Sequence, residues 1–377
     1  MKLKVDAQIL TKALEAVIRV IPNKSALPIL ECVLLRAEPD IITVIGSGDN
    51  RMEITLNDGF QVEEPGVVAV TAKTFLAMMK KTNSGDTITL EEKDDKLFVK
   101  KKGMRCSLQI LSKDESEYPN PAEMSDCKRI TIPFDELKKN IQNTLFAVGI
   151  ENELLSGKGL GYTLKINGNR MRGYAVDGYR VAARETELDE KDLGAVELRI
   201  PKSALSEIVK MGGKETGEKK IEISYNTKFV LFQMDKTKLF VRMLSDKAFD
   251  IDALVIDPDN HFEVKTSELY DAVDSLMPFV GGTYKTLTAR LDGNDETLTL
   301  SISTPIGEGE TTVDVKNLNP NVPLRSITIG FNINYFMDAV SAVEGETFDF
   351  ILNSNVAPVK FTDGNAYYIT LPVRLHA

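Results

Sequence analysis

The sequence is poor in the residues that build metal sites and disulfide frameworks. It contains 3 cysteines and 2 histidines in 377 residues. Cys32, Cys106 and Cys127 are odd in number and far apart, and only His261 and His376 accompany them. Such spacing supports neither a disulfide framework nor a zinc site. We expect no metal and no cofactor, and we expect three small buried thiols in a reducing compartment.

Long apolar runs are also missing. No run approaches the roughly 18 residues that a membrane span needs. The N-terminal stretch MKLKVDAQILTKALEAV carries charges where a signal peptide has its apolar region. We therefore expect a cytoplasmic protein. The net charge of −10 argues against a protein that coats nucleic acid non-specifically, although a basic surface can lie within an acidic whole.

No stretch of the chain predicts a catalytic site. The segment GKGLG at 157–161 lacks the Walker pattern and the strand, loop and helix that would surround a phosphate-binding loop. The carboxylates of SGDNRMEI and EKDDKL belong to a strand start and a hairpin turn. No histidine lies near a candidate nucleophile, which disfavours Ser-His and Cys-His arrangements.

What the chain does contain is an internal repeat of about 130 residues. Three segments, KVDAQILTKALEAVI, TIPFDELKKNIQNTL and EVKTSELYDAVDSLM, each begin as a strand and continue with helical spacing of apolar residues. A second set follows each of these: VTAKTFLAMMKK, IPKSALSEIVKM and FNINYFMDAVSA. The repeat predicts six related helices, two in each of three domains.

Short alternating segments between these helices, such as TITLEEKDDKLFVKK, indicate antiparallel strands joined by tight turns. We expect turns at Asp94-Asp95, at Asn226 and at Asp292-Gly293. Helices that cover antiparallel sheets make an α+β fold. Polar, proline-bearing stretches suggest domain boundaries, and we place the three domains at 1–127, 128–258 and 259–377.

Lysines recur away from the apolar stripe of these helices. If successive repeats present them on one face, they build a continuous basic surface that suits a polyanion read through its backbone. A solvated polar face is the simpler alternative for any single helix. The third repeat offers Asn332 and Asn334 instead. The lysines that we expect to contact such a polyanion are Lys24, Lys73, Lys80, Lys202 and Lys210.

Several motifs together resemble one known family. They are LPIL at 27–30, GSGDNRMEI at 46–54, VDGYRVA at 176–182 and LPVRL at 371–375. With the three tandem repeats, they resemble the bacterial sliding clamps, the β subunits of the replicative DNA polymerase. The resemblance covers essentially the whole chain.

The resemblance implies a fold and a task. Three clamp domains per chain would close as a head-to-tail homodimer into a six-domain ring, with helices lining the hole. Duplex DNA would pass through without being read by sequence. The replicative polymerase, the clamp loader and repair proteins would dock through short peptide motifs, and no catalysis is implied.

The resemblance also implies a peptide-binding pocket at the hairpin GYAVDGYRVAAR. Gly178 would let a peptide approach the backbone, and the stem of Arg180 would cover apolar surface while its head stays in water. An ordinary hairpin turn is the alternative. The pocket residues would be Val176, Gly178, Tyr179, Arg180, Val181, Asp250, Leu254, Val255, Pro358, Ile369, Leu371, Pro372, Val373, Arg374 and Leu375.

The sequence departs from the family pattern at this pocket. Asp250 stands where a proline is expected, Leu254 where a basic residue is common, and the chain continues to His376 and Ala377. We expect Asp250 to add a negative rim that favours peptides with a basic residue. These departures leave open a divergent or accessory clamp.

For the dimer contact, the basic run VKKKGMR at 99–105 and the acidic GEGE at 307–310 suggest opposite edges of one interface. Its residues would be Lys102, Arg105, Cys106, Leu108, Met277, Phe279, Glu308 and Glu310. Two other functions stay open: a clamp-like scaffold that no longer binds DNA, and a hydrolase that uses Asp177 and Arg180.

Overall fold

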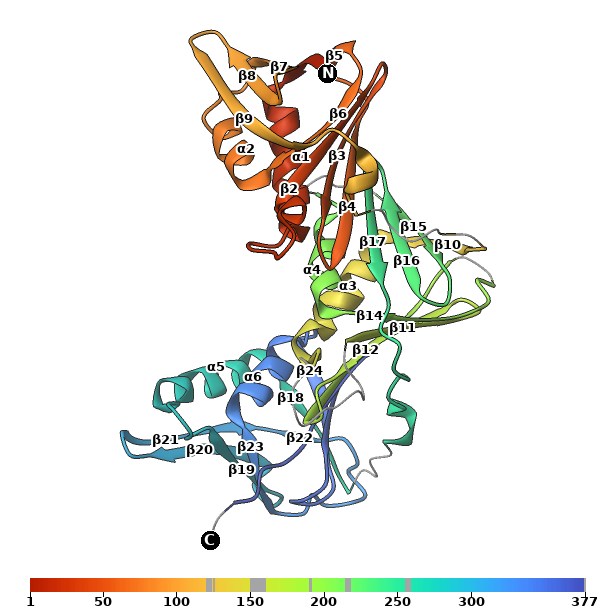
Figure 1. Cartoon of the computed structure of the whole chain (residues 1–377). Coiled ribbons are helices and arrows are strands. Elements are labelled where there is room, and N and C mark those ends of the chain that lie inside the picture. Colours follow the sequence, from red (N-terminus) through yellow and green to blue (C-terminus); the bar gives the residue numbers. More distant parts are fainter. Residues whose placement is uncertain are drawn as a thin grey trace. The chain divides into compact units, whose positions relative to one another are not determined.

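The structure is a computed structural model, and it describes residues 1–119, 124, 126–149, 161–189, 192–213, 218–254 and 259–375. The chain forms two compact units that do not follow the sequence repeat. One unit contains Met1–Phe134 with Ser203–Met243, and the other contains Asp135–Lys202 with Leu244–Ala377. The second repeat therefore contributes to both units (Figure 1).

In the first repeat, two helices alternate with nine strands. The helices are α1 (Ala7–Val17) and α2 (Ala72–Met79). The strands are β1 (Lys2–Asp6), β2 (Cys32–Glu38), β3 (Ile41–Ser47), β4 (Asn50–Leu56), β5 (Phe60–Glu64), β6 (Gly66–Thr71), β7 (Thr87–Lys93), β8 (Lys96–Lys101) and β9 (Met104–Ser112).

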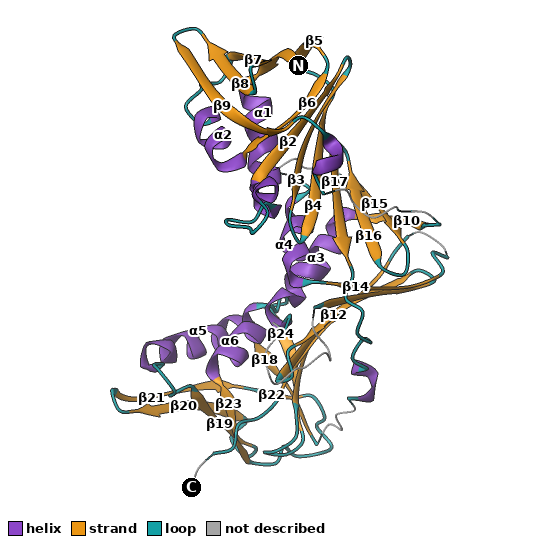
Figure 2. Ribbon diagram, in the orientation of Figure 1, coloured by secondary structure: helices purple, strands orange, loops and turns teal. Residues whose placement is uncertain are grey.

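The second and third repeats follow the same order. The second has helices α3 (Phe134–Thr144) and α4 (Lys202–Lys210) and strands β10 (Lys128–Pro133), β11 (Tyr162–Asn167), β12 (Arg170–Val176), β13 (Arg180–Glu187), β14 (Ala195–Ile200), β15 (Lys220–Tyr225), β16 (Phe229–Met234) and β17 (Thr237–Arg242). The third has helices α5 (Thr266–Leu276) and α6 (Ile333–Ser341) and strands β18 (Asn260–Lys265), β19 (Thr286–Asp292), β20 (Thr297–Thr304), β21 (Gly307–Asp314), β22 (Lys316–Asn317), β23 (Ile327–Asn332), β24 (Thr347–Leu352), β25 (Val359–Asp363) and β26 (Ala366–Thr370). The predicted α+β fold, with helices against antiparallel sheets, is confirmed (Figure 2).

All six predicted strand-to-helix transitions occur in the described residues. Each helix starts directly after its strand or one residue later. The side chain of Asp6 caps α1 by accepting from the N–H groups of Gln8 and Ile9, and Asn332 caps α6 in the same way through Asn334. The apolar positions of the first helices are buried as expected: Leu10 and Leu14, Leu137 and Ile141, Leu269 and Val273.

The tight turns also lie where the sequence places them. Asp94 and Asp95 both have positive φ, 51° and 58°, as a two-residue turn between β7 and β8 requires. The side chain of Asn226 accepts from the N–H groups of Lys228 and Phe229, and that of Asp292 accepts from Asn294. Short polar side chains that bond to their own backbone are typical of such turns.

The sheets continue from one repeat into the next. β4 of the first repeat pairs with β17 of the second, and β13 of the second pairs with β26 of the third. We call these pairings the first and the second junction. They complete a 13-stranded sheet in the first unit and a 9-stranded sheet in the second. A 4-stranded sheet, β21-β20-β19-β23, belongs to the second unit alone.

Candidate functional site

The segment from Asp177 to Arg180 is a true hairpin turn, and it lies at the second junction. β12 and β13 pair up to Val176 and Val181. Gly178 has a φ of 87°, which favours glycine because a Cβ is strained there. One carboxylate oxygen of Asp177 accepts from the N–H groups of Tyr179 and Arg180, each at 3.0 Å. The turn is thus held by its own aspartate.

Arg180 differs from the sequence-based expectation. Its side chain is only 11% exposed, so its head does not stay in water. The guanidinium donates to Asp177 at 2.7 Å, to Asp338 of α6 at 2.5 Å and to the carbonyl of Phe146 at 2.8 Å. Two carboxylates, a carbonyl and the nearby ring of Tyr335, 4.3 Å away, replace the lost water.

This ion-pair network also affects Tyr335 of α6. Burial is the largest cause that raises the pKa of its hydroxyl, and the negative charge of Asp177 adds to it while Arg180 opposes it. Both carboxylates of the network, Asp177 and Asp338, are bonded to Arg180, and Asp177 also accepts from the backbone of the turn. The contacts that the structure describes therefore orient the turn.

An apolar cluster lies beneath this turn and brings together four of the predicted pocket residues. Val176, Val181 and Ile369 are almost fully buried in it, and Leu254 packs against it. Residues that the sequence did not point to complete the cluster: Tyr174, Ala183, Ala248, Ile251 and Tyr367. Burial raises the pKa of Tyr367 to about 12. Tyr174 and Ala183 could have been predicted, because they lie two residues from Val176 and Val181 on the same hairpin and so share their face.

The C-terminal segment passes the turn in an extended form. The N–H of Leu371 donates to the carbonyl of Tyr179 at 2.8 Å, and the N–H of Val373 donates to Gly330 of β23. Leu371, Val373, Leu375 and Tyr179 leave much of their apolar surface exposed. Pro372 and Pro358 are half-buried, and Arg374 is exposed. The predicted wall therefore has an exposed apolar edge above a buried base.

The departures from the family pattern can be placed in part. Asp250 is exposed, and its side chain accepts from the N–H of Asp252 at the start of a short 3-10 helix, Ile251–Ala253. Asp252 itself pairs with Arg172 at 2.7 Å. Val255, His376 and Ala377 lie outside the described residues, as does most of GKGLG at 157–161.

The five predicted DNA-contacting lysines are all exposed, yet four of them already have partners. Lys80 pairs with Glu15 at 3.0 Å and Lys210 with Glu207 at 3.3 Å. Lys73 and Lys202 donate to backbone carbonyls, and Lys24 lies in the loop after α1. The pair of Lys80 and Glu15 is exposed on both sides and contributes little to stability, whereas Glu207 is almost fully buried.

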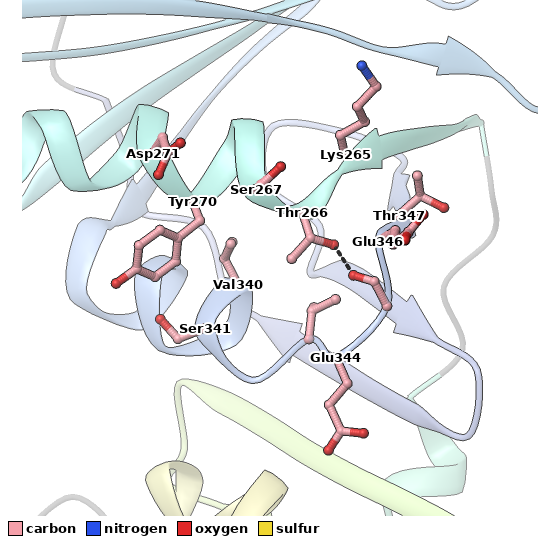
Figure 3. Close-up of a pocket in the computed structure, with 12 residues that line it drawn as sticks. Lys265, Thr266, Ser267, Tyr270, Asp271, Val340, Ser341, Glu344, Glu346 and Thr347 are labelled. Atoms are coloured by element: carbon pink, nitrogen blue, oxygen red, sulfur yellow. Dashed lines mark hydrogen bonds between the residues drawn. The ribbon is translucent and has the colours of Figure 1, made fainter.

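The basic helix face does not extend to the third repeat, where α5 and α6 carry no lysine or arginine. Their charged residues are Glu268, Asp271, Asp274 and Asp338. A hollow on this face is lined by the start of α5, the end of α6 and the segment Val343–Thr347, and its carboxylates outnumber its one lysine, Lys265 (Figure 3). The sequence offered Asn332 and Asn334 in place of lysines on the third repeat, and the five lysine contacts on the first two repeats stay a prediction.

Two free strand edges carry the predicted dimer residues. β9 pairs with β8 from Met104 to Gln109 and with β6 only at Ile110 and Ser112, so one edge of its first half is open. Among the residues that the structure describes, β21 pairs only with β20 and is the edge strand of its sheet. Arg105 and Cys106 lie on the first edge, and Glu308 and Glu310 lie on the second.

Apolar side chains lie close to both edges. Leu108 is buried, and Met277 and Phe279 form part of a half-buried 3-10 helix after α5. Phe279 lies so close to Gly309 that a Cβ there would be 2.9 Å from its ring. Lys102 is in the β8–β9 turn and is exposed.

The cysteines only partly fit expectation. Cys32 is buried, but Cys106 and Cys127 are partly exposed. None of the three is in a disulfide within the described part of the chain. Within the described ranges no group of three or more His, Cys, Asp or Glu side chains is placed to hold a metal ion. No helix in the described part of the chain is long and apolar enough to cross a membrane.

Three family models match consecutive segments of the chain. They describe the N-terminal domain of the DNA polymerase III beta subunit at residues 1–121, the central domain at 131–249 and the C-terminal domain at 254–374. Together they cover nearly the whole chain.

Curated relatives and solved structures agree with these models. The beta sliding clamps of Salmonella typhimurium and Bacillus subtilis are each 24% identical to this chain, with 100% of both chains covered. The DNA polymerase sliding clamp from Bacillus subtilis has a TM-score of 0.90 at 22% identity, with 100% of each chain covered. A sliding clamp from Pseudomonas aeruginosa bound to griselimycin has a TM-score of 0.89 at 20% identity, also with full coverage. At these identities the structures establish the shared fold.

Proposed function

The chain belongs to the bacterial DNA polymerase III β subunit family, the β sliding clamps, and from this premise we propose that two copies close head to tail into a ring around duplex DNA. The ring holds the replicative polymerase on its template and acts by tethering, without catalysis. Each of 1–127, 128–258 and 259–377 is one clamp domain, and the cytoplasm is the place of action.

The observation that carries this proposal is the matching register of the two junctions. Ser47 of β3 and Val176 of β12 are each the seventh residue after the first two-residue turn of their repeat. Their pairing partners, Arg51 of β4 and Val181 of β13, are therefore equivalent positions. Arg51 faces Phe240 at the first junction, and Val181 faces Ile369 at the second. Phe240 and Ile369 are in turn both the fourth residue after a two-residue turn. The repeats thus join by one rule.

The same rule applied to the two free edges predicts a third junction between chains. Glu308 is the repeat equivalent of Arg51 and Val181, and Ser107 is the equivalent of Phe240 and Ile369. In this register Glu308 lies opposite Ser107 and Glu310 lies opposite Arg105. At the first junction the corresponding pair, Glu53 and Lys238, also joins an acid to a base.

Burial supports this register. Met104, Cys106 and Leu108 alternate with the exposed Arg105 and Ser107 along β9. Glycines and a half-buried threonine alternate with exposed glutamates along β21. The register matches inner positions with inner and outer with outer, whereas a slip by one residue would place glutamates against the apolar face.

Exposed apolar residues at the ends of the two strands add to this support. Ile306 is 72% exposed and Leu111 is 42% exposed. In the proposed register they are diagonal neighbours on the outer face. Such a pair is within reach of long side chains.

We also propose that DNA contacts the helix faces of the first two repeats. Lys24, Lys73, Lys80, Lys202 and Lys210 would hold phosphates without reading bases. Replacing all five with glutamine should weaken DNA retention equally on all sequences. The slope of log affinity against log salt should fall by about 0.9 for each phosphate that the protein no longer neutralises. An unchanged slope would place the DNA elsewhere.

The peptide site is proposed at the second junction, where Val176, Val181, Leu254 and Ile369 form the buried base and Leu371, Val373 and Leu375 the exposed edge. Partners that carry short extended motifs, including the polymerase and the clamp loader, would dock there. Gly178, Tyr179, Arg180, Asp250, Pro358, Pro372 and Arg374 complete its surroundings. A clamp-fold scaffold without a replicative role is the alternative.

A topological experiment tests the ring. The clamp is loaded by a clamp loader onto nicked circular DNA, and the DNA is then cut once with a restriction enzyme. A closed ring stays on the circle at high salt and leaves after the cut, because it slides off the ends. Retention on linear DNA equal to that on the circle would contradict encirclement.

A further inference from the structure

A hollow of about 280 Å³ lies at the first junction, within the first compact unit. It is bordered by the β3–β4 turn, by the start of β16 and the end of β17, and by Pro119 and Met124. Its apolar part comes mainly from Phe229 and Phe240. The motif GSGDNR supplies the turn, and the clamp function described above makes no use of this hollow.

The register of the repeats relates this hollow to the proposed peptide site. Ser47 pairs with Arg51 as Val176 pairs with Val181. The facing positions on the neighbouring strands are Phe240 at the first junction and Ile369 at the second. Two residues further along these strands, Phe229 faces Arg242 at the first junction. Pro358 and Leu371 hold the corresponding positions at the second junction. Five lining residues of the hollow, Ser47, Arg51, Phe229, Phe240 and Arg242, are thus the repeat equivalents of Val176, Val181, Pro358, Ile369 and Leu371.

The chemistry of the two places differs at three positions. Ser47 replaces Val176, Arg51 replaces Val181, and Arg242 replaces Leu371. The side chain of Arg51 is almost fully buried, donates to Glu53 at 2.8 Å and to the carbonyl of Pro119 at 2.5 Å, and therefore has a fixed position. Arg242 is exposed, and no carboxylate of the described residues pairs with it.

The unpaired charge of Arg242 favours an anion at its end of the hollow. Arg51 also lines the hollow but is already paired with Glu53, and Asp49 is the one carboxylate of the lining. An unpaired guanidinium beside two partly exposed rings matches a ligand that brings a carboxylate and an apolar side chain together. An extended peptide does this readily because alternate side chains point the same way.

We propose that this hollow is a second docking site of the clamp, which takes an extended peptide segment of a partner protein with a large apolar side chain and an acidic residue. The assignment rests on the proposed peptide site at the second junction, since the repeat register carries it over. The two sites would then select different peptides, because an apolar position at one is an arginine at the other. A single chain would hold two partners at once.

The test measures binding of a fluorescein-labelled peptide, Phe-Gly-Asp-Gly-Phe, whose alternate Phe and Asp side chains share one face, to the full-length clamp by fluorescence anisotropy. Arg242→Glu should weaken binding about tenfold or more, because a charge-assisted hydrogen bond becomes a repulsion. Arg242→Lys should retain most of the affinity. Lys236→Glu, at the far end of the same hairpin and with an exposed partner in Asp58, is the matched control and should bind as wild type does.

A second variant separates this proposal from the proposed function. Deleting Leu371–Ala377 removes the edge of the site at the second junction and should leave binding of this probe unchanged. If the deletion abolishes binding while Arg242→Glu does not, the probe binds only at the second junction and the proposed second site is wrong. Absence of measurable binding to wild type at millimolar peptide would also overturn it. Loss of clamp-loader peptide binding in the deletion variant, in contrast, tests the proposed function alone.

Discussion

Reversing the charge of Glu310 tests the proposed seam between two chains at one cross-strand position. In the register of the junctions Glu310 lies opposite Arg105, and both side chains are exposed on the outer face. Opposite charges directly across an antiparallel pair contribute up to about 1 kcal/mol, and like charges destabilise by a similar amount. Glu310→Arg should therefore cost about 1.5 kcal/mol at each seam. A two-seam dimer would lose about 3 kcal/mol, which raises its dissociation constant roughly a hundredfold.

The assay is sedimentation velocity over a concentration series from nanomolar to micromolar. Arg105→Glu should weaken the dimer as much as Glu310→Arg, and the double reversal should restore most of the affinity because the pair is again of opposite sign. The matched control is Glu308→Arg, whose partner position is the uncharged Ser107. Full additivity of the two single reversals, with no rescue in the double variant, would refute the register. A monomer at all concentrations in wild type would refute the ring itself.

Three further outcomes follow from the structure. Arg180→Ala should lower the free energy of unfolding, measured in urea, by about 3 kcal/mol, because it leaves two carboxylates without their buried partner. Arg170→Ala on the same hairpin, where the side chain is 64% exposed, should lower it by less than about 1 kcal/mol. Equal losses would contradict the network. Hydrogen bonds from Lys113 hold the pKa of Asp95 below its usual value. Lys113→Met should therefore be less stable than wild type above about pH 4, and this difference should vanish as pH falls through the pKa that Asp95 has in the folded protein. A difference that persists at pH 2 would contradict this. Burial raises the pKa of the Cys32 thiol to about 11, so iodoacetamide at pH 8 should leave it unmodified in the native protein while the partly exposed Cys127 reacts, which mass spectrometry of the alkylated peptides checks.

The helices and their buried faces were predictable from the sequence because the information is local. Each strand-to-helix transition occurs within about ten residues, and apolar spacing identifies its inner face. Leu137 and Ile141 of α3 and Leu269 and Val273 of α5 are buried for this reason. The tight turns were likewise readable from Asp and Asn residues that bond to their own backbone.

The environment of Arg180 was not predictable in this way. Its partner Asp338 lies 158 residues further along the chain, and nothing in the local pattern indicates that α6 reaches the hairpin. An arginine among apolar neighbours is as compatible with snorkelling as with burial. Only the pairing of β13 with β26 brings the two elements together.

The hollow at the first junction was missed although a signal existed. GSGDNRM and VDGYRVA occupy the same place in successive repeats, so a role given to one raises the question of the other. The comparison needs the strand register, because Phe229 and Phe240 come from a different hairpin than Arg51. The acidic side chains of α5 and α6 were not predicted, since the repeat retains apolar positions and not the exposed charges.

The open edges of β9 and β21 have a consequence for how copies of this chain assemble. They are two different surfaces, so their contact is heterologous, and a heterologous contact either closes on itself or propagates into an open filament. Which of the two occurs depends on whether the rotations around the assembly add up to a full turn. Because the seam would use the same strand pairing as the two internal junctions, every joint would contribute to that sum. Changes in strand twist at β4 and β17, far from the seam, should then convert closed particles into filaments, which electron microscopy of the purified protein would reveal.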